Sequence, residues 1–359
     1  MPMQTFALNA GRINKYKGQI LSHAVPLEVL GRTGRQVKLP KNQSDTYVAR
    51  RWLPYGATAT SGNTINRFSQ DATAVDRGNL VVQAHQIAEG VTPTPDSIVP
   101  QDITVVMQQY GCLYGFTDKT YNLYEDDIPK AMIEQVGERV TFVNEMIIYG
   151  ALRACTNQYF GGTGTTIATV NGAITLGFVR KIAKNLQANH GKPVNKVLKS
   201  GPMYGTDAVA EGYTVYCHTD LEPDIRDLPN FTPAEKYASG TPMANEIGKC
   251  ERFRFITSPD LPALQDAATS VTATTYGLSS LTGTNPDVYP IIVTAQDAWS
   301  QIAVRGLEAL NPTFLPPGEK SKSDPMGQRG YAGTTWWKAV MIENQGWMAI
   351  GFVGAKTLV

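Results

Sequence analysis

Apolar side chains recur at three- and four-residue steps through the middle of the chain and predict one long amphipathic helix over residues 126–159. Its apolar stripe consists of Met132, Ile133, Val136, Val140, Val143, Ile147, Ala151 and Leu152. Asp126 or Asp127 can cap the N-terminus, and Pro129 suits the first turn. About thirty helical residues would span roughly 45 Å. We therefore expect a strut that ends at the glycine-rich run starting with Gly161.

The next part of the chain alternates helical and strand patterns. A second amphipathic helix is predicted over residues 176–189, with Phe178, Val179, Ile182 and Leu186 facing inward. Further elements are expected as a strand near 194–198, a helix near 204–211, and strands near 213–218 and 252–256. This half of the chain is therefore mixed α and β.

Two strands near the N-terminal end are separated by an unusually long connection. β-Branched and aromatic residues predict a strand over 46–53, and alternation predicts another over 103–116. The roughly fifty residues between them are rich in Gly, Thr, Ser, Asn and Pro. A connection of that length inside a compact domain usually has a role of its own. We therefore expect a hairpin that projects from the body and packs on another subunit.

The C-terminal third combines a polar stretch with short strands. Residues 258–290 are rich in Thr, Ser, Ala and Gly and are read as a loop or insertion. A strand at 289–294, a helical or turn segment at 297–301 and a crossing segment that begins at Pro312 follow. The chain closes with strands at 336–343 and 347–353, separated by a turn at 344–346.

Composition and charge narrow the class of protein. With 359 residues and 42% hydrophobic content, the chain can bury a large core, so a disordered or fibrous protein is excluded. The net charge of +1 argues against a protein that coats nucleic acid through a general positive field. Residues 1–54 nevertheless hold nine basic and two acidic side chains, a local charge of +7. This arm either is solvated or pairs with an acidic neighbour or another anionic surface.

The first 45 residues have little core of their own, and the four cysteines lie far apart without a CxxC pair. We expect these cysteines to be reduced core residues. No secretory leader and no run of 18 apolar residues is present, which predicts a protein that is made and used in a cytosol. Because the sequence begins with Met1, we also expect no N-terminal processing.

Each candidate for catalytic or metal chemistry has a simpler structural interpretation. The sequence has four histidines, at His23, His85, His190 and His218, and they lie too far apart in the sequence for a metal site. The glycine run from Gly161 lacks a Lys-Ser/Thr ending and a preceding strand, so it is interpreted as a flexible linker and not as a phosphate-binding loop. Cys217 and His218 are adjacent in a strand, where their side chains diverge.

Two remaining groups of residues also point to structure. Asp126 and Asp127 precede a helix, where capping is the expected role of a carboxylate. Trp336, Trp337 and Trp347 are interpreted as core or interface residues, although they could line a ligand groove. We therefore predict no catalytic, cofactor-binding or metal-binding residues and no enzyme activity.

The order of these parts resembles the Hong-Kong-ninety-seven fold shared by major capsid proteins of tailed bacteriophages, herpesviruses and encapsulin compartments. The resemblance is closest to capsid proteins of phages of the enterobacterial N-four type. The segments that carry it are 114–119 (YGFTDK), 245–256 (NEIGKCERFRFI), 287–298 (DVYPIIVTAQDA), 323–333 (SDPMGQRGYAG), 336–341 (WWKAVM) and 344–348 (NQGWM). It covers most of residues 105–359 and is weak over the arm and the hairpin tip.

The resemblance implies an α+β subunit of five parts. These are an N-terminal arm (1–45), an extended hairpin loop (46–120), a peripheral domain with a long spine helix (121–172), an axial α/β domain (173–330) and C-terminal strands that return to the peripheral domain (331–359). Such subunits would form hexamers and pentamers of one chain and tile an icosahedral shell. The extended segments would then gain burial only on assembly.

The resemblance also implies partners and a location. We expect the chain to pair with itself in a phage head that encloses double-stranded DNA, with a separate scaffolding protein, a portal and in some cases a decoration protein. No membrane is involved; the protein is located in the virion and assembled in the host cytoplasm. An encapsulin-like cargo shell is the alternative within this fold. A soluble α/β enzyme or binding module is the alternative from another class.

Overall fold

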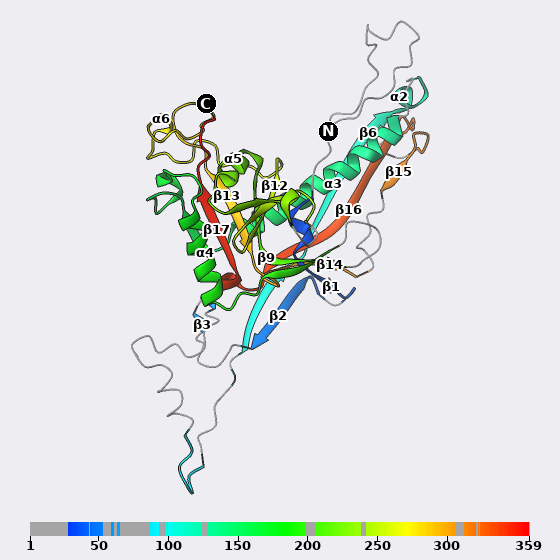
Figure 1. Ribbon diagram of the computed structural model, residues 1–359. Coiled ribbons are helices and arrows are strands. Elements are labelled where there is room, and N and C mark those ends of the chain that lie inside the picture. Colours follow the sequence, from blue (N-terminus) through cyan, green and yellow to red (C-terminus); the bar gives the residue numbers. More distant parts are fainter. Residues whose placement is uncertain are drawn as a thin grey trace.

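The computed structural model describes residues 28–42, 44–52, 59–60, 63–64, 86–92, 98, 100–123, 128–198, 206–237, 242–305, 312–320, 322 and 324–358. In this part of the chain, two β-sheets and a two-stranded ribbon are arranged around one long helix (Figure 1). We call the eight-stranded sheet the large sheet and the five-stranded sheet the small sheet.

The large sheet is mixed and has a helix-covered core on each face. Its path runs β10-β11-β12-β9-β13-β17-β7, with β8 paired to β9. The strands are β7 (Gln158–Phe160), β8 (Val194–Leu198), β9 (Thr206–His218), β10 (Phe231–Pro233), β11 (Glu246–Cys250), β12 (Phe253–Ser258), β13 (Tyr289–Thr294) and β17 (Met348–Val353). Helix α4 (Leu176–Ala188) packs on one face, and the C-terminal part of α3 (Ile128–Arg153) packs on the other.

Alternate residues of each central strand enter these two cores. On β13, Ile291 and Val293 face the α4 side, whereas Ile292 faces the α3 side. Every residue of β12, β13 and β17 is buried. A strand that is covered on both faces has a nearly continuous hydrophobic run, as β13 and β17 do; in β12 the run is interrupted by Arg254.

The small sheet is covered by the spine helix on one face only. It runs β1-β14-β16-β15, with β6 paired to β16. The strands are β1 (Arg35–Leu39), β6 (Gln108–Thr117), β14 (Trp299–Val304), β15 (Thr313–Leu315) and β16 (Arg329–Ile342). Helix α3 lies along β6 and β16 (Figure 1) and packs Val136 and Val140 against Cys112 and Trp336.

The ribbon leaves the small sheet as an antiparallel pair of strands. Strand β2 (Thr46–Trp52) pairs along its whole length with β5 (Pro100–Val106). Short pairs of residues at β3 (Ala59–Thr60) and β4 (Asn63–Thr64) belong to the connection between them. The remaining short helices are α2 (Asp118–Leu123), α5 (Glu222–Arg226), α6 (Ala273–Tyr276) and the 3-10 turns η2 (Leu30–Arg32), η3 (Ile167–Thr169), η4 (Thr219–Leu221), η5 (Ala234–Lys236) and η6 (Gln345–Trp347).

Most predicted elements are present, but four boundaries or types were wrong. The predicted strut ends at Arg153, not at residue 159, because the chain turns at Cys155 and Tyr159 pairs with Gly351 of β17. The predicted strand over 103–116 is two strands, separated at Met107, whose N–H donates to Asp45 O at 2.8 Å.

The other two errors lie in the second half. The helix expected at 204–211 is wrong, because residues from Thr206 onward form β9 and pair antiparallel with β8. Most of the helical or turn segment expected at 297–301 is also wrong, because Trp299 begins β14. In both places pairing with a neighbouring strand outweighs local propensity.

Two segments are more deeply packed than their composition suggests. Residues 259–288 are irregular as predicted, apart from the four-residue helix α6, yet Leu261, Ala268 and Val271 are buried in the α3-side core of the large sheet. The end of the N-terminal arm is also buried, at Val29 and Leu30. The two closing strands do not pair with each other, because β16 belongs to the small sheet and β17 to the large sheet.

Candidate assembly surfaces

The residues considered for catalysis serve structural roles wherever the structure describes them. The His218 imidazole caps η4, with its Nδ1 accepting from the Asp220 N–H at 3.1 Å. The neighbouring Cys217 is buried in the α4-side core, and burial raises the pKa of its thiol. The two side chains therefore do not form a nucleophile–base pair. All four cysteines are free and buried, as predicted.

No metal-binding cluster emerges from the described residues. Within them, no group of three or more His, Cys, Asp and Glu side chains is placed to hold an ion. His190 follows α4 with a left-handed backbone (φ 57°). His23, His85, Asp126 and Asp127 lie outside the described residues.

The glycine run from Gly161 is a packed turn, so its interpretation as a flexible linker was wrong. It directly follows strand β7, also contrary to prediction. A Cβ at Gly161 would come within 2.4 Å of Gly172 O, so glycine is required for this close approach. The Asn171 side chain accepts from the Thr163 N–H at 2.9 Å and closes the turn. Only the three-residue η3 follows, so no long helix presents its N-terminus to an anion here.

The three C-terminal tryptophans lie in or beside cores, as predicted. Trp336 is buried under α3, and its Nε1 donates to Asn144 Oδ1 at 3.0 Å. Trp337 packs at the base of the ribbon. Trp347 packs against both cores of the large sheet, and its Nε1 donates to Asn189 O at 2.8 Å.

The ribbon has one covered face and one open face. Tyr47, Ala49, Ile103 and Val105 pack against a small core formed with Leu39, Met107, Ile302, Ala339 and Met341. The opposite face carries Val48 and Trp52, which are 50% and 60% exposed. Between them Arg50 pairs across the strands with Asp102 at 2.7 Å, and this contact raises the pKa of Arg50 and lowers that of Asp102. This open face of the ribbon is apolar at its ends and internally charge-neutral at its centre.

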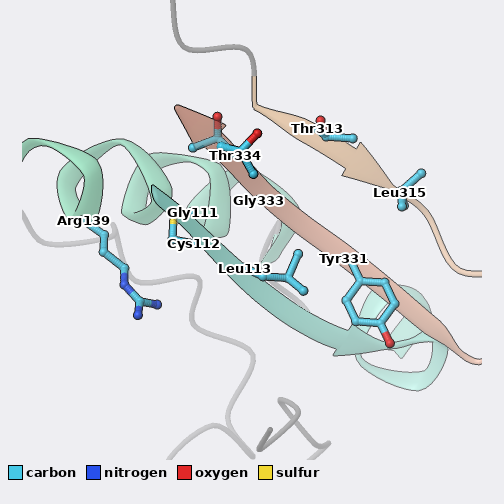
Figure 2. Close-up of a pocket in the computed structure, with 10 residues that line it drawn as sticks. Gly111, Cys112, Leu113, Arg139, Thr313, Leu315, Tyr331, Gly333 and Thr334 are labelled. Atoms are coloured by element: carbon cyan, nitrogen blue, oxygen red, sulfur yellow. The ribbon is translucent and has the colours of Figure 1, made fainter. Parts of the chain in front are cut away.

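The small sheet also has a groove of about 440 Å³ at the end formed by β6, β16 and β15, and Arg139 of α3 contributes to its lining (Figure 2). The groove is lined by Gly111, Cys112, Leu113, Arg139, Thr313, Leu315, Tyr331, Gly333, Thr334 and Thr335. Leu113 and Leu315 are 47% and 45% exposed. A Cβ at Gly333 would come within 2.8 Å of the Leu113 side chain, so a glycine is required at this position for Leu113 to lie over β16.

Sequence reasoning missed the buried charged residues. Arg254 of β12 and Glu246 of β11 form an ion pair at 2.5 Å in which both side chains are almost wholly buried. Glu145 of α3 is buried as well. The sequence did indicate both residues. Arg254 interrupts an apolar strand, and Glu145 lies three residues before Ile148, which places it on the buried side of α3.

None of the described helices is long and apolar enough to cross a membrane. The described part of the chain thus combines exposed apolar side chains on the ribbon and the small sheet with one buried ion pair.

This architecture defines the class: the chain has the Hong-Kong-ninety-seven capsid fold. The capsid of Ralstonia phage GP4 matches it with a TM-score of 0.61 over 100% of both chains, at 8% identity. The capsid of cyanophage Pam1 matches with a TM-score of 0.59 over 99% of this chain and 100% of the other, at 13% identity. These likenesses confirm the fold prediction.

Sequence comparison points to a particular kind of relative. The chain is 20% identical over 264 residues to the major capsid protein of Pseudomonas phage KPP21, a match that spans 68% of this chain and 65% of that protein. No family model matches the chain. The encapsulin SrpI of Synechococcus elongatus also shares the fold, with a TM-score of 0.53 over 99% of both chains at 10% identity. The predicted resemblance to phage major capsid proteins is thereby confirmed, and the N-four type stays a prediction.

Proposed function

We propose that this chain is the major capsid protein of a tailed bacteriophage and assembles as hexamers and pentamers into an icosahedral head around double-stranded DNA. The observation that carries the proposal is the pair of apolar faces that the described chain leaves uncovered, one on the ribbon and one on the small sheet. Exposed apolar surface of this kind marks a protein–protein contact. Likeness to the KPP21 capsid protein supports the same function.

Each of the two surfaces offers exposed apolar side chains to the other. The ribbon presents Trp52 and Val48 on its open face, and the small sheet presents a groove lined in part by Leu113 and Leu315. A tryptophan that enters an apolar groove is a typical interface anchor, for which truncation costs about 2 kcal/mol or more. We propose that the ribbon of one copy lies over the small sheet of its neighbour.

We propose that the subunit has the five parts that the resemblance implies. Residues 1–45 are the arm, 46–120 the extended hairpin loop, 121–172 the peripheral domain with α3 as its spine, 173–330 the axial domain and 331–359 the C-terminal strands. Of these last strands, which we expected to return to the peripheral domain, only β16 lies along α3. The small sheet with α3 is the platform on which a neighbour docks, and the large sheet is the rigid body that supports it. Strand β17 lies in that large sheet.

The remaining partners follow from the proposed shell. We propose a separate scaffolding protein and a portal, a decoration protein where one exists, assembly in the host cytoplasm and a final place in the virion. The chain acts by assembly and not by catalysis. The basic residues Arg12, Lys15 and Lys17 of the arm, and the projecting residues 56–98, are the parts that we expected to reach a neighbour. Apart from residues 59–60, 63–64, 86–92 and 98, they lie outside the described residues.

The test removes the apolar ends of the open ribbon face. The double variant Val48→Ser/Trp52→Ser should assemble poorly, because losing about 2 kcal/mol at a contact weakens it about thirtyfold. Light scattering and negative-stain microscopy of the purified chain measure the yield of closed shells. The matched control is Tyr276→Ser/Leu281→Ser, which removes two equally exposed apolar side chains far from the ribbon and should assemble normally.

The possible outcomes test the ribbon contact and the capsid function separately. If the ribbon variant forms shells at the wild-type yield, the ribbon is not an assembly contact. If the unmodified chain is absent from the shells of the particles isolated from its natural source, the capsid function itself is wrong. Shells that contain a protein cargo and no DNA when isolated from their natural source would favour an encapsulin, which the likeness to SrpI keeps as the second candidate.

A further inference from the structure

The last residues of the N-terminal arm are docked in a pocket between α3 and the two sheets. Val29 and Leu30 are 1% and 0% exposed and pack with residues of the α3-side core, including Ile148 and Trp299. Gly34 lies so close to the Trp299 ring that a Cβ would come within 2.5 Å of it. The docked segment, residues 28–34, is therefore the point at which the arm joins the body.

One carboxylate of the spine helix holds this docked segment. Glu145 Oε1 accepts from the backbone N–H of Val29 at 3.1 Å and of Leu30 at 2.9 Å. These N–H groups belong to the beginning of η2, where they have no partner within the turn. The contact spans more than 110 residues of sequence, so it is a tertiary attachment and not a local cap.

The other oxygen of the same carboxylate is buried without a hydrogen bond to any described residue. Glu145 is 1% exposed, and its Oε2 has no hydrogen-bond partner among the described residues. Two more buried polar atoms without a described partner are Trp299 Nε1 and Ser300 Oγ, both on strand β14, which pairs with β1 directly after the docked segment. A carboxylate taken out of water with one oxygen unsatisfied carries a desolvation cost while it is ionised.

Charges around Glu145 offset this cost only in part. Lys338 of β16 faces it and is 8% exposed, yet Glu145 forms no ion pair with any described residue. Glu28 of the docked segment adds a like charge. Tyr216 of β9 lies against the same site. Its hydroxyl is hydrogen-bonded to Thr33, and the positive charge of Arg32 acts on this tyrosine.

We propose that docking of residues 28–34 is coupled to proton uptake by Glu145, so that the arm is held more tightly in acid than at neutral or alkaline pH. When the segment is released, Glu145 is exposed to water on α3 and ionises as an ordinary carboxyl. When the segment closes, the same group is enclosed with an unpartnered oxygen, and the neutral form is favoured. Segment closure and protonation therefore stabilise each other.

The electrostatics of the docked state agree with this geometry. Burial is the largest influence on Glu145 and raises its pKa to about 7, against the lowering effect of its two backbone hydrogen bonds and of Lys338. A raised carboxyl pKa means that docking is tightest below the ordinary pKa of glutamate, weakens as the pH rises, and becomes constant above about 7. Acid therefore strengthens the docking of this segment, whereas acid weakens an exposed salt bridge.

The test is hydrogen–deuterium exchange of the full chain between pH 5 and 8.5, with exchange times scaled for the intrinsic rate at each pH. Protection of the peptide that covers residues 28–34 should fall by about one to two orders of magnitude between pH 5 and 7.5. In Glu145→Gln, which fixes a neutral side chain, protection should be nearly independent of pH. The control Glu134→Gln changes an exposed carboxylate of the same helix and should behave as the wild type.

A second variant distinguishes a proton switch from a structural contact. Lys338→Met removes the positive charge that lowers the pKa of Glu145, so the pH at which protection falls should move upward. A purely structural role for Glu145 would not move this midpoint. A flat profile in the wild type, or an unchanged slope in Glu145→Gln, would overturn the proposal. The measurement requires no assembled shell, so its outcome is independent of the proposed capsid function.

Discussion

The large sheet and the small sheet of this molecule differ in how much of their apolar surface the chain itself covers. In the large sheet, β12, β13 and β17 are buried at every position, between α4 on one face and α3 with residues 258–290 on the other. In the small sheet, α3 covers one face. The ribbon covers the other face over Ile302, Ala339 and Met341 but leaves the end with the groove open, where Leu113 and Leu315 are exposed. The ribbon repeats this one-sided pattern, with open and covered positions alternating along β5.

This difference shows which apolar surface is buried when one chain folds and which is left for contact with another subunit. A sheet with both faces covered gains its full hydrophobic stabilisation within one chain. A sheet with one open face leaves part of that stabilisation to a partner, at about 25 cal/mol for each Å² of apolar surface that the partner covers. Substitutions in the large sheet should therefore change subunit stability, whereas substitutions on the open faces should change association.

The largest effect is expected in the large sheet, at the buried ion pair. Arg254→Met leaves the Glu246 carboxylate buried without its counter-charge and should lower the free energy of unfolding by about 3–5 kcal/mol. Urea denaturation followed by circular dichroism measures the change. The double variant Arg254→Met/Glu246→Leu should recover part of the loss. Recovery is incomplete because Glu246 also accepts from Tyr237 Oη at 2.6 Å and from the Met243 N–H at 2.7 Å. A single variant as stable as the wild type would show that the pair is not needed.

A smaller loss of stability is expected on α3, because this helix carries both buried and solvent-exposed apolar side chains. Val136 is 2% exposed under the small sheet, and Val136→Ala should lower the free energy of unfolding by about 2 kcal/mol through lost burial and a residual cavity. Ile133, which the sequence pattern placed on the apolar stripe, is 37% exposed, and Ile133→Ala should cost less than about 0.5 kcal/mol. Equal losses from the two variants, measured by the same denaturation experiment, would contradict the one-sided coverage of this helix.

The same contrast explains which elements could be predicted from the sequence. The helices over 128–153 and 176–188, and the strands at 46–52 and 289–294, were predictable because their apolar spacing agrees with their final burial. The strand over residues 206–211 was missed because its structure comes from pairing with β8, which local propensity does not encode. The end of α3 was missed for the same reason, since Tyr159 takes its conformation from β17.

The candidate surfaces were predictable only in part. The long connection between β2 and β5 indicated a projecting hairpin, and the pairing of these strands confirms its base. The groove was not predictable, because it depends on Gly111 and Gly333 meeting side chains of distant strands. The attachment of the arm was also missed, because Glu145 meets Val29 and Leu30 only after the whole chain has folded.

A loss of stability smaller than that of Val136→Ala is expected where the chain passes from one sheet to the other. Strand β16 ends at Ile342 in the small sheet, and β17 begins at Met348 in the large sheet, with Trp347 between them. Trp347→Phe keeps an aromatic ring in the core but removes the hydrogen bond from Nε1 to Asn189 O, so it should cost about 1 kcal/mol in the free energy of unfolding. Native-state hydrogen exchange should show the loss of protection at the C-terminal end of α4, whose cap contains that carbonyl, and none over β6. Equal loss of protection over β6 would mean that Trp347 stabilises both sheets. The segment between β16 and β17 would then not separate the large sheet, which the chain covers itself, from the small sheet, which it leaves partly open.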